Sequence, residues 1–271
     1  MVKQKHNALY NRLRAIGGLS LVELLTAMLL SSIVVMGLYN FLISQRRTYT
    51  LQDEISEMQQ NLRVAMEKIS RDLQMSGFGK PFWTTISGVN LGASPPFSLR
   101  ITGGKTMEIV GCLDPAAATL STALASNSTT ISLDGGQASK FNTTTKADIS
   151  IEGRENVRIV AISGDILTID RDPGFGGIEG VLYSYPAGSK VYLVHYATYT
   201  IDTSSNPSTL VMDEHQGSGN QPVATNIVSM SASMAGNLVT VTLIGRTRNP
   251  DRTTGKYGTA QLTSQICLRN H

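Results

Sequence analysis

The sequence contains few residues of the types that build metal, redox and disulfide-rich sites. Its 271 residues include 2 cysteines, 4 histidines and 1 tryptophan. The cysteines form no CxxC motif and no cysteine–histidine cluster, so their spacing gives no support for a zinc site. P-loop, dinucleotide-binding and GxSxG motifs are also missing from the sequence. We therefore expect no enzymatic activity, no cofactor and no metal ion.

Acidic residues are missing from the first 18 positions, which hold four basic residues, Lys3, Lys5, Arg12 and Arg14. Subtracting these 4 from the 23 lysines and arginines leaves 19, against 20 aspartates and glutamates. The rest of the chain is therefore close to neutral, and we expect no basic face for nucleic acid. The basic N-terminus instead favours a cytoplasmic position in front of a membrane segment.

Proline is missing between Leu19 and Lys80, and this stretch begins with a long apolar run. Residues 19–43 number 25 and include one charged residue, Glu23. As a helix they would extend about 37 Å, which is enough to span a hydrocarbon core with some tilt. An ionised carboxylate inside lipid is costly, so the position of Glu23 needs an explanation.

Three interpretations of this N-terminal segment treat Glu23 differently. A secretory signal peptide has an apolar region of ~7–15 residues and a small-residue cleavage site, and this run is too long for one. An uncleaved signal anchor fits the length, with Glu23 near enough to the start of the run to reach the headgroups. Cleavage after Gly18 would make Leu19 a new N-terminus about one helical turn from Glu23, where the amine stabilises the carboxylate.

The segment Gly18-Leu19-Ser20-Leu21-Val22-Glu23 resembles the class III leader of type IV prepilins and secretion pseudopilins. In that family a short basic leader ends in glycine, and an acidic residue stands fifth after the cut. The resemblance implies that a prepilin peptidase cleaves between Gly18 and Leu19 and N-methylates Leu19. It also implies that Glu23 pairs with the N-terminal amine of a neighbouring subunit during assembly. The sequence departs from the family in having Leu19 where phenylalanine is commonest.

The C-terminal stretches ATNIVSMSASMAGNLVTVTLIGRTRN and LTSQICLRNH resemble, more weakly, the end of PilW-type minor pilins. The two resemblances imply a minor type IV pilin that primes or caps the pilus. Its partners would be the prepilin peptidase, other minor and major pilins, and the inner-membrane assembly platform, with lipid around the helix before assembly. The implied location is a single pass through the inner membrane with a cytoplasmic N-terminus and a periplasmic C-terminal domain, and then the pilus at the cell surface.

Apolar residues continue past the membrane run at spacings of three or four residues. They are Leu51, Ile55, Met58, Leu62, Ala65, Ile69 and Leu73. This spacing predicts an amphipathic helix, and glycines and a proline from position 77 onward predict its end. We expect one helix from Leu19 to Ser76, with a membrane or filament-core half over 19–45 and an amphipathic half within 46–79.

Residues 80–271 show short alternating segments separated by glycine, asparagine, aspartate and proline. The expected strands are 98–101, 107–110, 148–151, 157–162, 165–170, 190–201, 227–234, 238–244 and 261–268. Ser163-Gly164 and Gly236-Asn237 predict hairpin turns. The sequence thus predicts an α+β, pilin-like fold in which the long N-terminal helix packs on an antiparallel β domain. Residues 115–145 are expected to form a loop or transition, and about 129–194 a small barrel-like β insertion.

Cys112 and Cys267 have two possible states. Both could be free buried thiols, but pairing becomes the expected state if the domain lies outside the cytoplasm. The two positions are 155 apart in the sequence, and a bridge over that span would add about 5 kcal/mol in the chain-entropy model. It would tie the last strand to the start of the β domain.

Candidate ligands and bases are few. His195 stands in an alternating segment and is expected to be a packed or surface strand residue rather than a base. Met212–His215 offers oxygen and nitrogen ligands, but it precedes a Gly-Ser-Gly-Asn run, so a solvated loop is expected there. Asp165, Asp170 and Asp172 do not have the spacing of an EF-hand.

Two alternative functions remain open. A pseudopilin of a type II secretion system, GspJ-like, would share the processing and belong to a different machine. A signal-anchored periplasmic binding or adhesion module would use the helix as a stalk and would keep residues 1–18. Genomic neighbours would separate the first alternative from a pilin, and the N-terminal sequence of the protein would separate the second.

Overall fold

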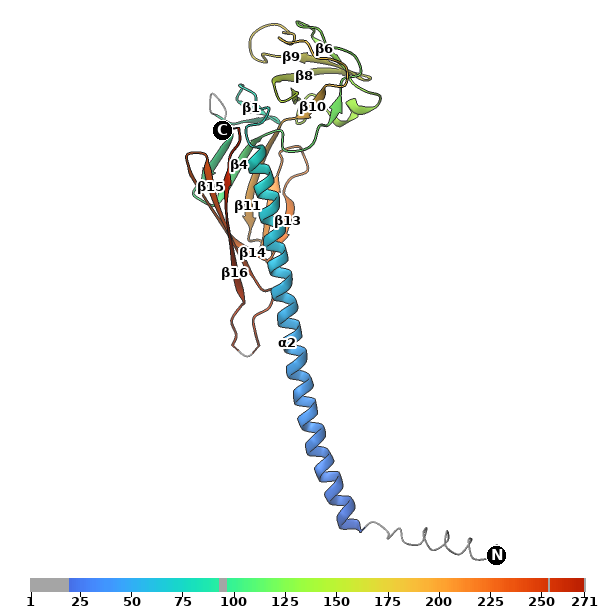
Figure 1. The fold of residues 1–271 in the computed structure, drawn as a ribbon, viewed down its shortest axis with the longest axis vertical. Coiled ribbons are helices and arrows are strands. Elements are labelled where there is room, and N and C mark those ends of the chain that lie inside the picture. The colour runs from blue at the N-terminus through green and yellow to red at the C-terminus, as the bar shows by residue number, and fades with distance from the viewer. Residues whose placement is uncertain (1–19, 93–96, 253, 271) are drawn as a thin grey trace, which may run out of the picture. The chain divides into compact units, whose positions relative to one another are not determined.

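The computed structural model describes residues 20–92, 97–252 and 254–270. These residues form an α+β fold in which one long helix, α2 (Leu21–Met75), is followed by antiparallel strands (Figure 1). The strands are β1 (Thr85–Ile86), β2 (Val89–Asn90), β3 (Leu99–Thr102), β4 (Thr106–Gly111), β5 (Ala118–Thr119), β6 (Thr130–Ser132), β7 (Asp148–Ile151), β8 (Glu155–Ser163), β9 (Ile166–Asp170), β10 (Lys190–Leu193), β11 (His195–Asp202), β12 (Thr209–Asp213), β13 (Gln221–Thr225), β14 (Ile227–Ala235), β15 (Leu238–Arg246) and β16 (Thr259–Cys267). A short 3-10 helix, η1 (Gln137–Lys140), lies between β6 and β7.

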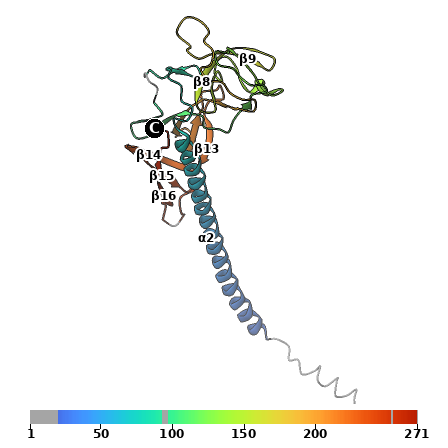
Figure 2. The same ribbon diagram turned by 45° about the horizontal axis from the view of Figure 1, so that its top comes forward.

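The chain divides into two compact units, Met1–Asp53 and Glu54–His271, with the boundary inside α2. Within the second unit, the helix buries one face against the sheets (Figure 2). The predicted apolar stripe is confirmed here, because Met58, Leu62, Ala65, Ile69 and Leu73 are each at most 3% exposed. Burying a methionine, leucine or isoleucine side chain stabilises the fold by about 1.5–3 kcal/mol relative to leaving it in water.

Helix α2 ends one residue before the predicted position, at Met75. The chain turns at Gly77, whose φ of 79° lies in the left-handed region that favours glycine. The Gly77 N–H donates to the carbonyl oxygen of Val110 (2.8 Å), so the end of the helix is fixed to β4. A side chain at this position would place its Cβ 2.1 Å from the carbonyl oxygen of Asn270.

The helix packs against two antiparallel sheets. One has five strands in the order β13-β12-β11-β4-β3, and the other has three in the order β14-β15-β16. Their inward side chains and the helix stripe form one hydrophobic core, which includes Ile109, Tyr199 and Leu243. Gly245 of β15 lies close against the helix, since a Cβ there would be 2.8 Å from Met58 Cγ.

A third sheet, in the order β5-β10-β7-β8-β9-β6, surrounds its own core of buried residues. Its two outer strands meet, because Leu120 and Leu133 form a bridge and the Ser121 N–H donates to Ser132 O (2.9 Å). The sheet therefore closes on itself, and we call strands β5–β10 the barrel unit (upper part of Figure 1). The unit is inserted between β4 and β11, which are paired neighbours in the five-stranded sheet.

Most of the expected strands overlap strands of the structure, but the single strand expected over 190–201 is two strands, β10 and β11, which belong to different sheets. Both hairpins are confirmed, since two-residue turns join Ser163 to Ile166 and Ala235 to Leu238. The expectation of a loop or transition over 115–145 is wrong in part, because β5, β6 and η1 lie there. Those strands have two and three residues, too few to show an alternating pattern.

Candidate functional site

Glu23 lies in the first turn of α2, where it forms a capping box with Ser20. The Ser20 N–H donates to Glu23 Oε2 (3.2 Å), and Ser20 Oγ accepts from the N–H of Val22 (3.3 Å). These bonds satisfy N–H groups that the start of a helix leaves without intrahelical partners. The carboxylate also lies at the positive end of the helix dipole, which stabilises its charge. Gly18 and Leu19, the predicted residues of cleavage and methylation, lie outside the described residues.

The apolar residues after Glu23 are exposed. Every residue from Ser20 to Leu42 is exposed, and Leu21 and Met36 reach 76% and 69%. Among the described residues, α2 is the one helix long and apolar enough to serve as a membrane span or signal anchor. An exposed apolar surface of this extent calls for lipid or other protein chains around it.

A group of polar side chains gathers at the root of the barrel unit, where the chain leaves β4 and returns in β11. Asp114 stands three residues after the end of β4, His195 is the first residue of β11, and Glu214 follows the end of β12. These three strands are neighbours in one sheet, so their ends bring the side chains together. One ligand atom from each of the three residues lies within 4.8 Å of the other two.

The histidine of this group is buried and held by an amide. His195 is 3% exposed, and its Nδ1 lies 2.9 Å from Gln216 Nε2. Its Nε2 lies 3.6 Å from Asp114 Oδ2, and its Nδ1 lies 4.0 Å from Glu214 Oε2. Burial lowers the pKa of His195 below its ordinary value, while the charges of Asp114 and Glu214 act in the opposite direction. The neutral ring is favoured, with one nitrogen as donor and the other as acceptor.

The segment Met212–His215 is only partly the solvated loop that its sequence suggests. Its first two residues belong to β12, and the first of them is buried. His215 turns away from the cluster and stacks on Tyr196 with ring centroids 4.5 Å apart. Glu214 is the residue of this segment that approaches His195. The expectation failed for the first two residues because pairing with β11, not local sequence, makes them a strand.

The carboxylate of Glu108 of β4 is buried and has a structural role. Arg100 donates to it through Nε (2.6 Å) and Nη2 (2.5 Å), and the Tyr196 hydroxyl donates to Oε1 (2.6 Å). The Arg100 hydrogen bonds hold the pKa of Glu108 below its ordinary value. Because these residues come from β3, β4 and β11, the network joins three adjacent strands.

The predicted bridge between Cys112 and Cys267 is not formed in the structure, where both are free thiols. Cys112 is fully buried with its Sγ 4.0 Å from the carbonyl oxygen of Gly79, and burial raises the pKa of its thiol far above the ordinary value. A buried thiol of this kind is unreactive. Cys267 is exposed at the end of β16. The alternative of two free, buried thiols therefore holds for Cys112 and fails for Cys267, which is free but exposed.

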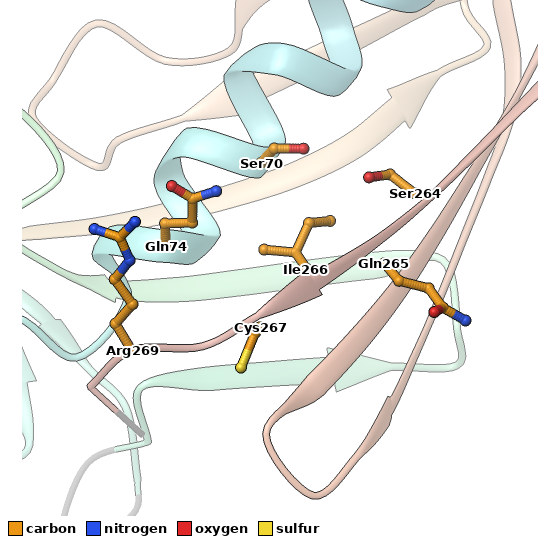
Figure 3. Close-up of a pocket in the computed structure, with 7 residues that line it drawn as sticks. All are labelled: Ser70, Gln74, Ser264, Gln265, Ile266, Cys267 and Arg269. Atoms are coloured by element: carbon orange, nitrogen blue, oxygen red, sulfur yellow. The ribbon is translucent and has the colours of Figure 1, made fainter.

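A surface pocket of about 590 Å³ lies beside Cys267, between α2 and β16 (Figure 3). Ser70 and Gln74 of the helix line it together with Ile266, which points toward the helix in the close-up. Arg269 is the one charged residue in the lining. A single guanidinium among neutral side chains provides no base or nucleophile pair for catalysis.

Sequence reasoning missed two parts of these sites. Ser20 and Glu23 have the three-residue spacing of a capping box directly before an apolar run, so that signal was present in the sequence. Asp114 had a weaker signal, an acid before proline after an apolar strand. Nothing local pairs Asp114 with His195, since the barrel unit separates them along the chain.

Comparison with known proteins assigns no family to this chain. No protein-family model, no curated protein and no solved structure gives a significant match.

Proposed function

We propose that this protein is a minor type IV pilin, which primes or caps pilus assembly after a prepilin peptidase has removed residues 1–18 and methylated Leu19. The observation that carries the proposal is the N-terminal part of α2, an exposed apolar surface with one carboxylate, Glu23, in its first turn. A plain anchor accounts for the apolar surface. A charged carboxylate five residues after Gly18 is better accounted for by a cleaved, assembling helix.

The mechanism is structural and uses the same surface twice. Before assembly, lipid surrounds the apolar side chains from Leu21 to Leu42, which have no cover within the described chain. In the filament, the helices of neighbouring subunits replace the lipid. Glu23 then offers its charge to the amine of a neighbouring N-terminus, which removes the cost of leaving either group alone in an apolar core. The β sheets of residues 54–271 select the partners.

The charge of Glu23 can be tested apart from its capping role. Glutamine also serves at the third position of a capping box, so Glu23→Gln keeps the cap and loses the charge. We expect Glu23→Gln to insert and be cleaved normally but to assemble as poorly as Glu23→Ala. The measurement is the amount of pili on cells, with membrane-bound mature protein as the loading control.

Ser20→Ala is the matched control, since it removes the serine half of the cap and keeps the carboxylate. It should reduce assembly far less than Glu23→Gln. Normal piliation in Glu23→Gln would mean that Glu23 only caps the helix, and the charge-pairing mechanism would be withdrawn.

Processing separates the proposal from the anchored-module alternative. Intact mass and N-terminal sequencing of the membrane protein should give a chain that starts at methylated Leu19 when prepilin peptidase is present. Without the peptidase the chain should keep residues 1–18. Retention of the leader in both strains would move the signal-anchored binding or adhesion module to first place. The GspJ-like alternative shares this processing. Deletion of this protein distinguishes the two, because loss of pili supports the pilin and loss of secretion supports the pseudopilin.

A further inference from the structure

We propose that Asp114, His195 and Glu214 form a binding site for a zinc-type divalent cation at the root of the barrel unit. The three residues supply one imidazole and two carboxylates from three neighbouring strand ends. The site involves none of the exposed apolar residues Leu21–Leu42 of α2, and the proposal does not rest on pilus assembly. It lies wholly within residues 54–271, which form one compact unit.

The distances suit an ion placed between the groups better than a direct bond. His195 Nε2 and Asp114 Oδ2 are 3.6 Å apart, which is too long for a hydrogen bond between nitrogen and oxygen. Two ligands of one zinc ion, each at about 2.0–2.2 Å, are separated by roughly this distance in a tetrahedral site. Glu214 Oε2 lies nearest to the other ring nitrogen, at 4.0 Å from Nδ1, so its carboxylate has to rotate toward Nε2 to join the ion. The mutual limit of 4.8 Å for one ligand atom of each residue keeps that movement short.

Gln216 supplies the outer partner that a metal-binding histidine needs. Its amide lies against Nδ1 of His195, so the other ring nitrogen, Nε2, is the one directed at Asp114. A half-turn of the amide places its oxygen at Nδ1, where it accepts the ring N–H and leaves the Nε2 lone pair for the ion. Such a contact orients the imidazole and increases its basicity as a ligand.

The ligand set selects the kind of ion. Calcium and magnesium prefer oxygen ligands alone, and a buried imidazole is a poor ligand for both. One imidazole with two carboxylates suits zinc and its first-row neighbours, with solvent in the fourth position. The side chain of Asp114 is 48% exposed, so the site has an open side from which the ion and its water enter.

The position of the site gives the ion a structural task. Asp114 lies on the segment that leads out to the barrel unit, and His195 lies where the chain returns from it. Glu214 directly follows β12, the strand beside β11. An ion held by all three would clamp both connections of the barrel unit to the five-stranded sheet, and it would bind the folded state alone.

Zinc titration of the tag-free full chain in detergent, after EDTA treatment, tests the proposal. We expect one zinc ion per chain, a higher melting temperature with zinc, and an X-ray absorption spectrum with nitrogen and oxygen neighbours only. Asp114→Asn and Glu214→Gln should each weaken binding at least about tenfold, and Gln216→Ala by about 10–100-fold. His215→Gln is the matched control, because this neighbouring histidine stacks on Tyr196 instead, and it should bind as the wild type does.

His195→Gln should abolish zinc binding, and circular dichroism must show that this variant folds. If it does not fold, the exposed Asp114→Asn variant decides the question. Any of four results would overturn the proposal: no stoichiometric zinc uptake by the wild type, wild-type affinity in Asp114→Asn, sulfur in the absorption spectrum, or displacement of zinc by equimolar calcium.

Discussion

Two parts of the same helix, α2, meet opposite surroundings. From Leu21 to Leu42 every residue is exposed, although most of them are apolar. From Met58 to Leu73 one stripe is fully buried, and mainly polar and charged residues occupy the rest of the circumference. The helical backbone is continuous through both parts. The comparison teaches that a segment can be helical without being buried by its own chain. The apolar surface of the first part can gain stability only by contact with lipid or with another protein chain.

The largest difference between the two parts should appear when a leucine is shortened in each. Leu73→Ala should destabilise the β region by about 2–5 kcal/mol, because it removes a fully buried side chain and leaves a cavity. Leu30→Ala should leave the unfolding of the β region unchanged, since Leu30 is 62% exposed. Urea denaturation in detergent, followed by tryptophan fluorescence, measures both. Equal destabilisation by the two variants would show that the two parts of the helix do not differ in their contribution to the stability of the β region.

An arginine introduced into each part should have the larger effect in the first part, the reverse of the leucine truncations. Val34→Arg should raise the apparent free energy of membrane insertion by about 3 kcal/mol, as arginine does near the centre of a membrane helix. Val64→Arg should fold and insert normally, because Val64 is 48% exposed on the amphipathic part. Carbonate extraction of membranes measures the inserted fraction of each chain. If Val34→Arg inserts as well as Val64→Arg, the first part does not lie in lipid.

A smaller contrast concerns two glycines. Gly245→Ala should cost about 1–3 kcal/mol, because the new methyl group would meet Met58 and Leu62 of the helix. Gly37→Ala should leave the β region unaffected, since no atom of the described residues, apart from the adjoining residues and turns of its own helix, lies within 4 Å of the new group. Melting temperatures of the two variants measure the difference. A Gly37→Ala variant that is stable but fails to assemble would sharpen the comparison, because it would place a neighbouring helix at Gly37.

The sequence predicted those features that depend on local pattern. The spacing from Met58 to Leu73 identified the buried stripe, and the turn signals Ser163-Gly164 and Gly236-Asn237 identified the hairpins. The capping box of Ser20 and Glu23 was readable in the same way and was missed. The free state of Cys112 was left open, because bridging depends on which strands meet.

By itself the sequence determined the long helix, its apolar first part and its amphipathic second part, since 3.6-residue periodicity and the absence of proline are properties of contiguous residues. Only the tertiary structure decided which distant residues meet. The closure of the barrel unit, the buried contact of Gly245 with the helix, and the grouping of Asp114, His195 and Glu214 all depend on strand order. Strand order is fixed by the packing of a whole core. It therefore cannot be predicted from the residues that flank any one position in the sequence.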